Sequence, residues 1–560
     1  MDTSLVARSP SRYSRAEKKV ELRIILIWFL RDIELFTVVL RGAALAFEAL
    51  LLGGVAYLLA VALPASASTP VDDFCRRGIR MAALALVVCE VLLISASGAL
   101  LMNGSDLTFT DVTTTNFFRA DSFAILFAMG LWLCARLKGR AATVTMLALS
   151  LLLLAAAVST SHAVARIDSR VTSAILTAAH HLGTATWLGA MPYLWISLGR
   201  VEGVDEARRL SERYSRMALL GVATLVLAGL GMAWSYVGTW SGLYTTAYGI
   251  MLVAKIYLFF AMVALGAGNY FLVRRLASNP KPLLARLRRV VEAEICLGFI
   301  AILTAASLIA QAPAVDAAIQ DTLTPHEIYV RLHPELPRMS SPPLAALAPP
   351  ASLEEAVKDT QFVPTVWSDD NDRAWSEYNH HWAGLIVLIA GLLALLSRHP
   401  TMRWARFWPL IFAGLAVFIV VRADPENWPL GPRPFWQSFA APDVLQHRFG
   451  ALLIVVFAVF ECAVQAGKLR SRWASYVFPV MCALGAATLL THEHATKDVR
   501  EALIVEMSHT PIALFGVTAG CGRWLEMRLP ASRMATIAGY IWPVCLALVG
   551  LILLNYRELA

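Results

Sequence analysis

The sequence predicts an all-α integral membrane protein that crosses a lipid bilayer many times. Of its 560 residues, 58% are hydrophobic and only 16% are charged, whereas about 25% of the residues in an average soluble domain are charged. Apolar stretches as long as the roughly 20 residues that a helix needs to cross a bilayer recur along the whole chain. Helices are expected because only helices and closed barrels satisfy all backbone hydrogen bonds in lipid.

Fourteen apolar stretches predict about fourteen transmembrane helices in two bundles. The first eight stretches lie near residues 40–62, 80–101, 121–137, 141–162, 171–198, 215–237, 247–273 and 287–311. The last six stretches lie near residues 378–397, 405–422, 447–467, 474–491, 506–527 and 535–555. We therefore expect an eight-helix membrane domain at 40–312 and a six-helix membrane domain at 377–560.

Two polar segments complete the predicted organisation. Residues 313–376 contain the proline-rich stretch "LHPELPRMSSPPLAALAPPASLEEAV" (332–357), which favours a linker or a docking segment over a compact domain. Residues 1–39 are charged and interrupted by acids, so we expect a cytoplasmic or interfacial segment there rather than a cleaved signal peptide.

Lysine and arginine gather in alternate loops, and therefore on one side of the membrane. These loops are "CRRGIR" (75–80), "ARLKGR" (135–140), "EARRLSERYSR" (206–216), "RRLASNPKPLLARLRR" (274–289), "RHPTMRWAR" (398–406), "KLRSR" (468–472) and "RWLEMRLPASR" (523–533). The positive-inside rule makes that side cytoplasmic, so 313–376 is expected in the periplasm and the protein in a bacterial inner membrane. The same loops account for the net charge of +8, and the chain has no nucleic-acid-binding motif.

Eleven of the twelve histidines lie on the outer side or within predicted spans. Imidazole is the commonest metal ligand and suits copper, zinc, nickel and iron. Because carboxylates accompany these histidines in the second bundle, we expect one outer layer of metal ligands there. Its candidate residues are His380, His381, His447, His492, His494, His509, Asp424, Glu426 and Glu506. The alternative is that interfacial histidines only anchor their helices at the lipid headgroups.

Two more candidate ligands belong to the first bundle. His162 ends the fourth predicted span, and His180 lies inside the fifth, next to His181. An imidazole in lipid is costly and usually faces a bundle interior with a partner. These histidines are therefore either metal ligands or residues that only make a hydrogen bond in the core.

Other charged residues also lie in or near the predicted spans of the first bundle, among them Glu48, Glu90, Lys255, Glu292 and Glu294. Lys255 is expected about 12 Å into its helix, at 1.5 Å per residue, where it would neutralise a buried acid. Glu292 and Glu294 are expected near the cytoplasmic edge, where water would solvate them.

Several stretches resemble the copper resistance protein D family. They are "TSHAVARIDSRVTSAILTAAHHLGTATWLGAMPYLW" (160–195), "YSRMALLGVATLVLAGLGMAWSYVG" (214–238), "TAYGIMLVAKIYLFFAMVALGAGNYFLVRRL" (246–276) and "LRRVVEAEICLGFIAILTAASL" (287–308). The family positions that match are His162, His180, Trp187, Gly189, Tyr248, Gly249, Lys255, Asn269 and Glu294. Ala190 replaces a second glycine of the family pattern. The second bundle resembles the C-terminal extension of long members, in "NHHWAGL" (379–385), "THEHA" (491–495) and "EMSHT" (506–510).

The resemblance implies an inner-membrane protein, not an enzyme, that binds copper ions, Cu(I) or Cu(II), and transports or transfers them. It also implies a periplasmic copper-binding partner of the resistance protein C type. Two alternatives stay open. Histidines on facing helices can hold haem b, as in a membrane cytochrome, and the chain can instead be a factor that delivers copper to another protein without transport. No nucleotide-binding loop is present, so transport would use a gradient or ligand exchange.

Overall fold

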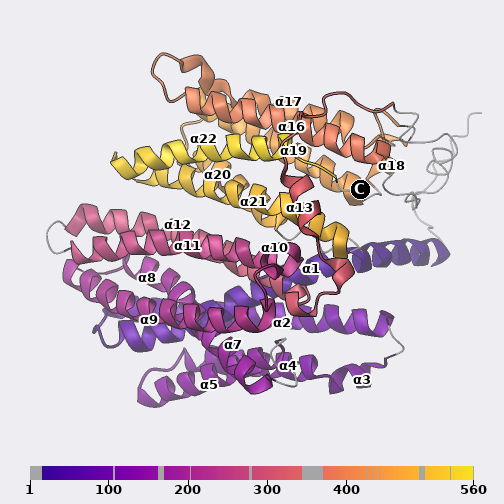
Figure 1. Ribbon diagram of the computed structural model, residues 1–560. Coiled ribbons are helices and arrows are strands. Elements are labelled where there is room, and N and C mark those ends of the chain that lie inside the picture. Colours follow the sequence, from indigo (N-terminus) through magenta and orange to yellow (C-terminus); the bar gives the residue numbers. More distant parts are fainter. Residues whose placement is uncertain are drawn as a thin grey trace, which may run out of the picture.

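The structure is a computed structural model that describes residues 15–104, 107–161, 169–201, 203–276, 280–343, 370–425, 427–431, 433–439, 442–490, 499–529 and 531–558. These residues are helical almost throughout, and their only β-pairing is one isolated bridge between Asn427 and Arg433. The predicted all-α class is therefore confirmed. Figure 1 shows long, nearly parallel helices, as expected for a protein that crosses a membrane many times.

The N-terminal half of the chain forms the first bundle. Its long helices are α1 (Arg15–Tyr57), α2 (Thr69–Gly104), α4 (Asn116–Cys134), α5 (Arg140–Ser159), α7 (Arg170–Thr184), α9 (Val204–Val237), α11 (Ala247–Arg274) and α12 (Pro280–Ala310). Its shorter pieces are η1 (Leu58–Ala62), α3 (Phe109–Thr114), η2 (Ala185–Gly189), α8 (Met191–Ser197) and α10 (Gly242–Thr245). Helix α1 is continuous from residue 15, so the segment expected to lie along the membrane surface joins the first span as one helix.

Helices α7 and α8 follow one another through the first bundle and are joined by the π-helical turn η2. This turn presses against α1 at two glycines. A Cβ atom added to Gly189 would lie 1.8 Å from the carbonyl oxygen of Ala49, and one added to Gly53 would lie 2.3 Å from the carbonyl carbon of Gly189. Small residues allow such close helix approach in membranes, so glycine is required at this crossing.

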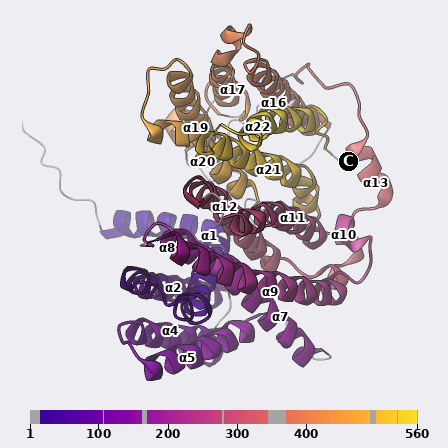
Figure 2. The ribbon, with the colours of Figure 1, turned by 90° about the vertical axis from the view of Figure 1, so that its left-hand side faces the viewer.

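The C-terminal half forms the second bundle, which is a ring of six helices (Figure 2). In order around the ring they are α16 (Asp370–Leu396), α17 (Pro409–Arg422), α19 (Pro442–Gln465), α20 (Arg472–Leu489), α21 (Val499–Arg528) and α22 (Arg533–Leu554). Aromatic side chains fill the centre: Trp408 lies 5.4 Å from Trp542 and 5.7 Å from Phe478 between ring centroids. The short elements η5 (Arg403–Phe407) and α18 (Phe435–Ser438) lie in its loops.

Helix α21 joins the two bundles by packing against α11 and α12. Its Ala513 and Val517 belong to the same hydrophobic core as the first bundle. Near the C-terminal end of α21, Arg528 donates two hydrogen bonds to Glu292 of α12, at 2.9 and 2.7 Å. The connecting segment between the bundles includes η3 (Ala314–Asp316), η4 (Ile319–Asp321) and α13 (Pro325–Leu332). Figure 2 shows α13 at the right-hand edge of the molecule.

Eleven helices of the described residues are long and apolar enough to cross a bilayer, so the chain is a polytopic membrane protein. Three of the fourteen predicted spans, near 171–198, 474–491 and 506–527, are not among these eleven. The π turn divides the first of them, and α20 has only a short apolar stretch, Trp473–Ala486. Helix α21 carries charged side chains near both of its ends and the polar residues Ser508, His509 and Thr510 between them. The number of fourteen therefore remains a prediction.

Candidate functional site

His180 lies on α7 inside the first bundle and contacts Lys255 of α11. Its Nε2 atom is 3.5 Å from the Nζ atom of Lys255, at the limit of a hydrogen bond. An ammonium group can only donate, so it fixes Nε2 as the acceptor and leaves the proton on Nδ1. That Nδ1 atom is buried without a hydrogen-bond partner, next to Gly229. We expected Lys255 to neutralise a buried acid, but it contacts an imidazole instead.

The neighbouring His181 has a carboxylate partner. Its Nδ1 atom lies 2.9 Å from Oε1 of Glu48 on α1. Consecutive residues on a helix point about 100° apart, because one turn takes 3.6 residues. His180 and His181 therefore contact different helices, and only His181 forms an ion pair when it is protonated.

Glu292 and Glu294 of α12 are buried, which contradicts our expectation that water solvates them; their exposed fractions are 8% and 2%. Helix α21 covers the face of α12 that carries Glu292 and places Arg528 against its carboxylate. Glu294 instead accepts hydrogen bonds from Asn269 and Trp187. These long-range contacts are not visible in the sequence of α12.

In the N-terminal part of α16, His380 stacks on Tyr556, with ring centroids 3.7 Å apart. Its Nδ1–H donates to the carbonyl oxygen of Ser376 at 2.8 Å, which leaves the lone pair of a neutral ring on Nε2. Tyr556 donates its hydroxyl to Glu558 at 2.6 Å, and burial raises the pKa of this phenol. His509 of α21 is close enough to interact electrostatically with His380.

Both ring nitrogens of His381 make hydrogen bonds with the backbone. Its Nδ1 accepts from the backbone N–H of Arg338 at 2.6 Å, and its Nε2–H donates to the carbonyl oxygen of Tyr556 at 2.9 Å. The residue is 5% exposed. Because its only lone pair is occupied in this arrangement, His381 fastens the connecting segment and the C-terminal tail to α16.

His447 of α19 pairs with Asp424, which follows α17. Its Nδ1 lies 2.8 Å from Oδ1 of Asp424, and half of its side chain is exposed. A histidine that donates one ring N–H to a carboxylate presents the other nitrogen in a fixed orientation, as metal-ligating histidines do. This pair is held by α17 and α19, whereas His380 and His509 lie on α16 and α21.

Glu506 of α21 lies at the boundary between the bundles and is 1% exposed. Gln311, just beyond α12, donates to its Oε1 atom, and its Oε2 atom is buried without a partner. One turn further along α21, Thr510 contacts the sulfur of Met251 on α11, at 3.9 Å. Oxygen and sulfur atoms from both bundles thus meet at this boundary.

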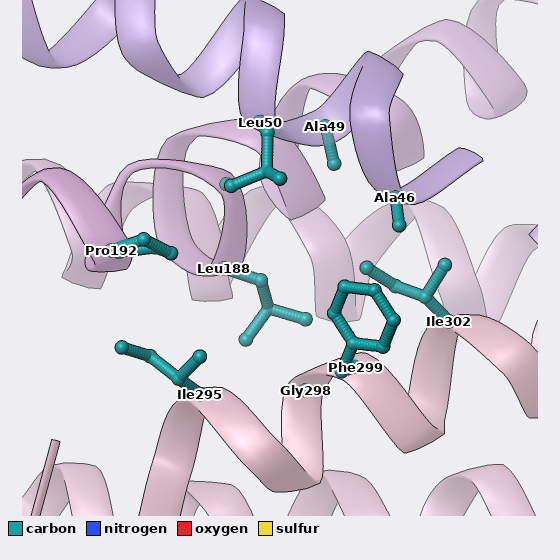
Figure 3. A pocket seen from close by; sticks show the side chains of 10 residues that line it. Ala46, Ala49, Leu50, Leu188, Pro192, Ile295, Gly298, Phe299 and Ile302 are labelled. Atoms are coloured by element: carbon teal, nitrogen blue, oxygen red, sulfur yellow. The ribbon is translucent and has the colours of Figure 1, made fainter. Parts of the chain in front are cut away.

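The described residues contain no group of three or more histidine, cysteine, aspartate or glutamate side chains placed to hold one metal ion. His162, Glu426, His492 and His494 lie outside these residues, so the expected single outer layer stays a prediction. A cavity of about 30 Å³ lies between α1, η2 and α12 (Figure 3). Its lining is wholly apolar, with Leu188, Ile295 and Phe299 among the lining residues, and has room for about one water molecule.

Sequence reasoning missed several residues that surround the candidate ligands. Tyr556 and Glu558 lie in the C-terminal tail, and Arg331, on α13, extends over the ring of Tyr556 at 4.3 Å. Arg331 is 4% exposed although its helix is a short polar one. Its burial depends on the connecting segment folding back onto α21, where it donates to Ser508 at 3.2 Å. The one local signal was the capping box of Thr324 and Glu327, which predicts that helix.

Comparison with known proteins identifies one family. The copper resistance protein D family matches residues 208–308, which include most of α9, all of α11 and nearly all of α12. The match confirms the stated resemblance within these residues, which are less than a fifth of the 560 residues. The resemblance of 160–195 and of the second bundle stays a prediction. No curated protein and no solved structure matches the chain.

Proposed function

The chain contains a copper resistance protein D domain at residues 208–308, and from this premise we propose that it binds copper ions at its outer face and passes them into the first bundle. The observation that carries this proposal is the contact between His180 and Lys255. Lys255 belongs to the matched domain, and its ammonium group lies 3.5 Å from Nε2 of His180. The lone pair of a neutral imidazole is a metal ligand, so the ammonium group occupies the place that an exchangeable cation would take.

Capture begins at the outer end of the second bundle. His380 and His447 both donate Nδ1–H to an oxygen atom, which is the arrangement in which metal-ligating histidines are oriented toward an ion. His509 lies near His380. We propose that His492, His494, Glu426 and Asp424 add ligands to this outer site, and that His381 has a supporting role.

Transfer then follows the boundary between the bundles. Glu506 offers a buried oxygen without a partner, and the thioether of Met251 lies on the α11 face opposite Thr510. Met251 and Lys255 are four residues apart on α11, and so share one face of the helix. A copper ion passing Met251 would next reach His180, with His162 as a further proposed ligand.

Lys255 then has a clear role in this proposal. Its ammonium group occupies the place of a cation at Nε2 of His180. Copper and the ammonium group repel each other and compete for the same nitrogen atom. Copper binds His180 only when Lys255 moves aside, so His180 is a transient rather than a storage site.

We propose that the outer segment 313–376 docks a periplasmic copper-binding protein, which supplies or receives the ion. Because neutral imidazole is the ligand and the ordinary pKa of histidine is about 6.5, copper retention is expected to fall as the pH drops below that value.

Metal analysis and an optical spectrum of the purified protein test the proposed function. We expect bound copper, and we expect simultaneous alanine substitutions at His492, His494 and His509 to abolish its retention. A triple variant that keeps all of its copper would refute the outer site. A Soret band without copper would instead support the haem alternative, and copper exchange with a partner without flux in proteoliposomes would support the delivery alternative.

A further inference from the structure

Glu294 is a carboxylate in the interior of the first bundle without a positively charged partner. It is 2% exposed and lies five residues beyond Arg289, or about 8 Å further along α12. Asn269 Nδ2 donates to its Oε2 at 2.7 Å, and Trp187 Nε1 donates to its Oε1 at 3.2 Å. Among the described residues, none forms an ion pair with it.

Four elements contribute to this site. Trp187 comes from the π turn η2, Asn269 from α11, and Glu294 from α12. Tyr214 of α9 donates its hydroxyl to the carbonyl oxygen of Trp187 at 2.9 Å. Helix α11 approaches closely, because a Cβ atom added to Gly266 would lie 3.1 Å from Oε1 of Glu294. The carboxylate therefore lies in a polar site that side chains of these elements form, rather than in an unfilled space.

The charged groups on neighbouring elements contact residues other than Glu294. Glu292, on the same helix, is bound by Arg528 of α21 and by Arg289. On α1, Glu48 pairs with His181, and on α11, Lys255 contacts His180. The thiols of Cys296 and Cys521 and the phenol of Tyr214 are neutral groups.

An ionised carboxylate inside a membrane bundle is costly without a counter-ion. Asn269 can bond to both forms of the acid. Its amide N–H donates to a carboxylate, and after a flip of the amide its oxygen accepts from a carboxylic acid O–H. The distance of 2.7 Å fits either bond. In the present orientation, Oδ1 of Asn269 is buried without a partner, as expected of a group that serves two states.

We propose that Glu294, Asn269, Trp187 and Tyr214 form an intramembrane proton site, in which Glu294 takes up a proton from water on one side of the membrane and releases it to water on the other. Only a proton is transferred: the carboxylate of Glu294 binds it to become a carboxylic acid and later releases it to become a carboxylate again. Coupling of this proton to copper movement rests on the proposed function, whereas the protonation itself does not.

Infrared difference spectroscopy of the full chain in lipid nanodiscs, stepped through pH without copper, tests the proton site. We expect a carboxylic acid C=O band that shifts in D2O, is missing in Glu294→Gln and is retained in the matched control Glu292→Gln. Asn269→Leu is expected to shift the band because it removes one hydrogen bond, and this variant gives the same test if Glu294→Gln does not fold. A band that neither variant changes, or one that responds to sodium rather than to pH, would overturn the proposal.

Proteoliposomes test the coupling. We expect an imposed pH gradient to change copper flux in the unaltered protein, and Glu294→Gln to retain flux down a copper gradient without responding to pH. A Glu294→Gln variant that still responds to the pH gradient would overturn the coupling. Unaltered protein without any copper flux would refute the transport function alone, because the infrared result does not depend on copper.

Discussion

The two bundles treat buried charge differently. In the second bundle, Glu526 accepts hydrogen bonds from Arg398 and Arg523, and Trp542 donates to it at 2.9 Å. Arg523 also lies 3.4 Å from Glu461. In the first bundle, by contrast, Lys255 and Glu294 have no oppositely charged partner among the described residues.

This difference separates structural charges from candidate functional ones. A buried ion pair is neutral as a unit, and removing one member leaves the other uncompensated. A buried charge without a counter-ion destabilises the fold, so it is retained for another reason, such as binding or proton transfer. We therefore expect substitutions at the paired charges of the second bundle, such as Arg523, to affect stability, and substitutions at Lys255 and Glu294 of the first bundle to affect transport.

The largest expected effect follows from replacing Arg523 with alanine. The change leaves Glu461 without its arginine and Glu526 with only Arg398, and removing one partner of a buried ion pair costs about 3–5 kcal/mol. We expect loss of the folded protein, measured as aggregation during size-exclusion chromatography in detergent. Arg523→Lys is the matched control, because it keeps the charge. A fully stable alanine variant would remove the distinction between the bundles.

Replacing Arg528 with alanine is expected to weaken the contact between the bundles. Hydrogen bonds to charged groups contribute about 1.5–3 kcal/mol, and Glu292 keeps its bond to Arg289. The variant should therefore fold but unfold at a lower temperature, with protease cutting between the bundles at lower temperatures than in the unaltered protein. An unchanged melting temperature would show that apolar packing of α21 alone holds the bundles together.

Replacing Lys255 with leucine tests the first bundle, because leucine removes the charge without adding a copper ligand. Removal of a competing cation should strengthen copper binding at His180 by roughly tenfold, or about 1.4 kcal/mol, and should slow its release. The fold should be as stable as before, or more stable, because an uncompensated charge is lost. Equilibrium dialysis against copper measures the affinity, and Lys255→Arg is the charge-retaining control. Weaker copper binding in the leucine variant would contradict the role given to Lys255.

The sequence predicted where charges lie better than it predicted their partners. Apolar run length predicted long membrane-crossing helices, because crossing a bilayer fixes the length of a helix. It did not show that Lys255 contacts His180, or that α21 buries Glu292, because both contacts join helices far apart in the chain. It also did not show that His447 pairs with Asp424 whereas His380 stacks on Tyr556.

His380 and His381 look alike in the sequence, yet the structure gives them different contacts. His381→Gln is expected to lose about 1 kcal/mol of stability, the usual net contribution of a hydrogen bond, with little change in bound copper. His380→Gln is expected to lower copper retention with little change in stability. Thermal unfolding and metal analysis of both variants measure the two effects. Equal copper loss in both variants would mean that the backbone bonds of His381 do not exclude it from ligation.

The smallest effect is expected for an exposed ion pair at one end of the first bundle. Lys138 donates to Asp73 at 2.8 Å, and both side chains are about half exposed. The hydrogen bond to Asp73 raises the pKa of Lys138 above its ordinary value of 10.5. The charge of Lys138 therefore contributes to the stability of the fold near neutral pH, and this contribution is lost only as the pH rises from 10.5 through the raised pKa.

Near neutral pH, Lys138→Ala should leave the melting temperature unchanged within error, because water and salt screen an exposed pair. The same experiment at low ionic strength provides the control, since screening is then weaker. If this variant were as destabilising as Arg523→Ala, burial would not be what distinguishes the structural charges of this protein. The comparison between the bundles would then have to rest on the number of hydrogen bonds to each charge instead.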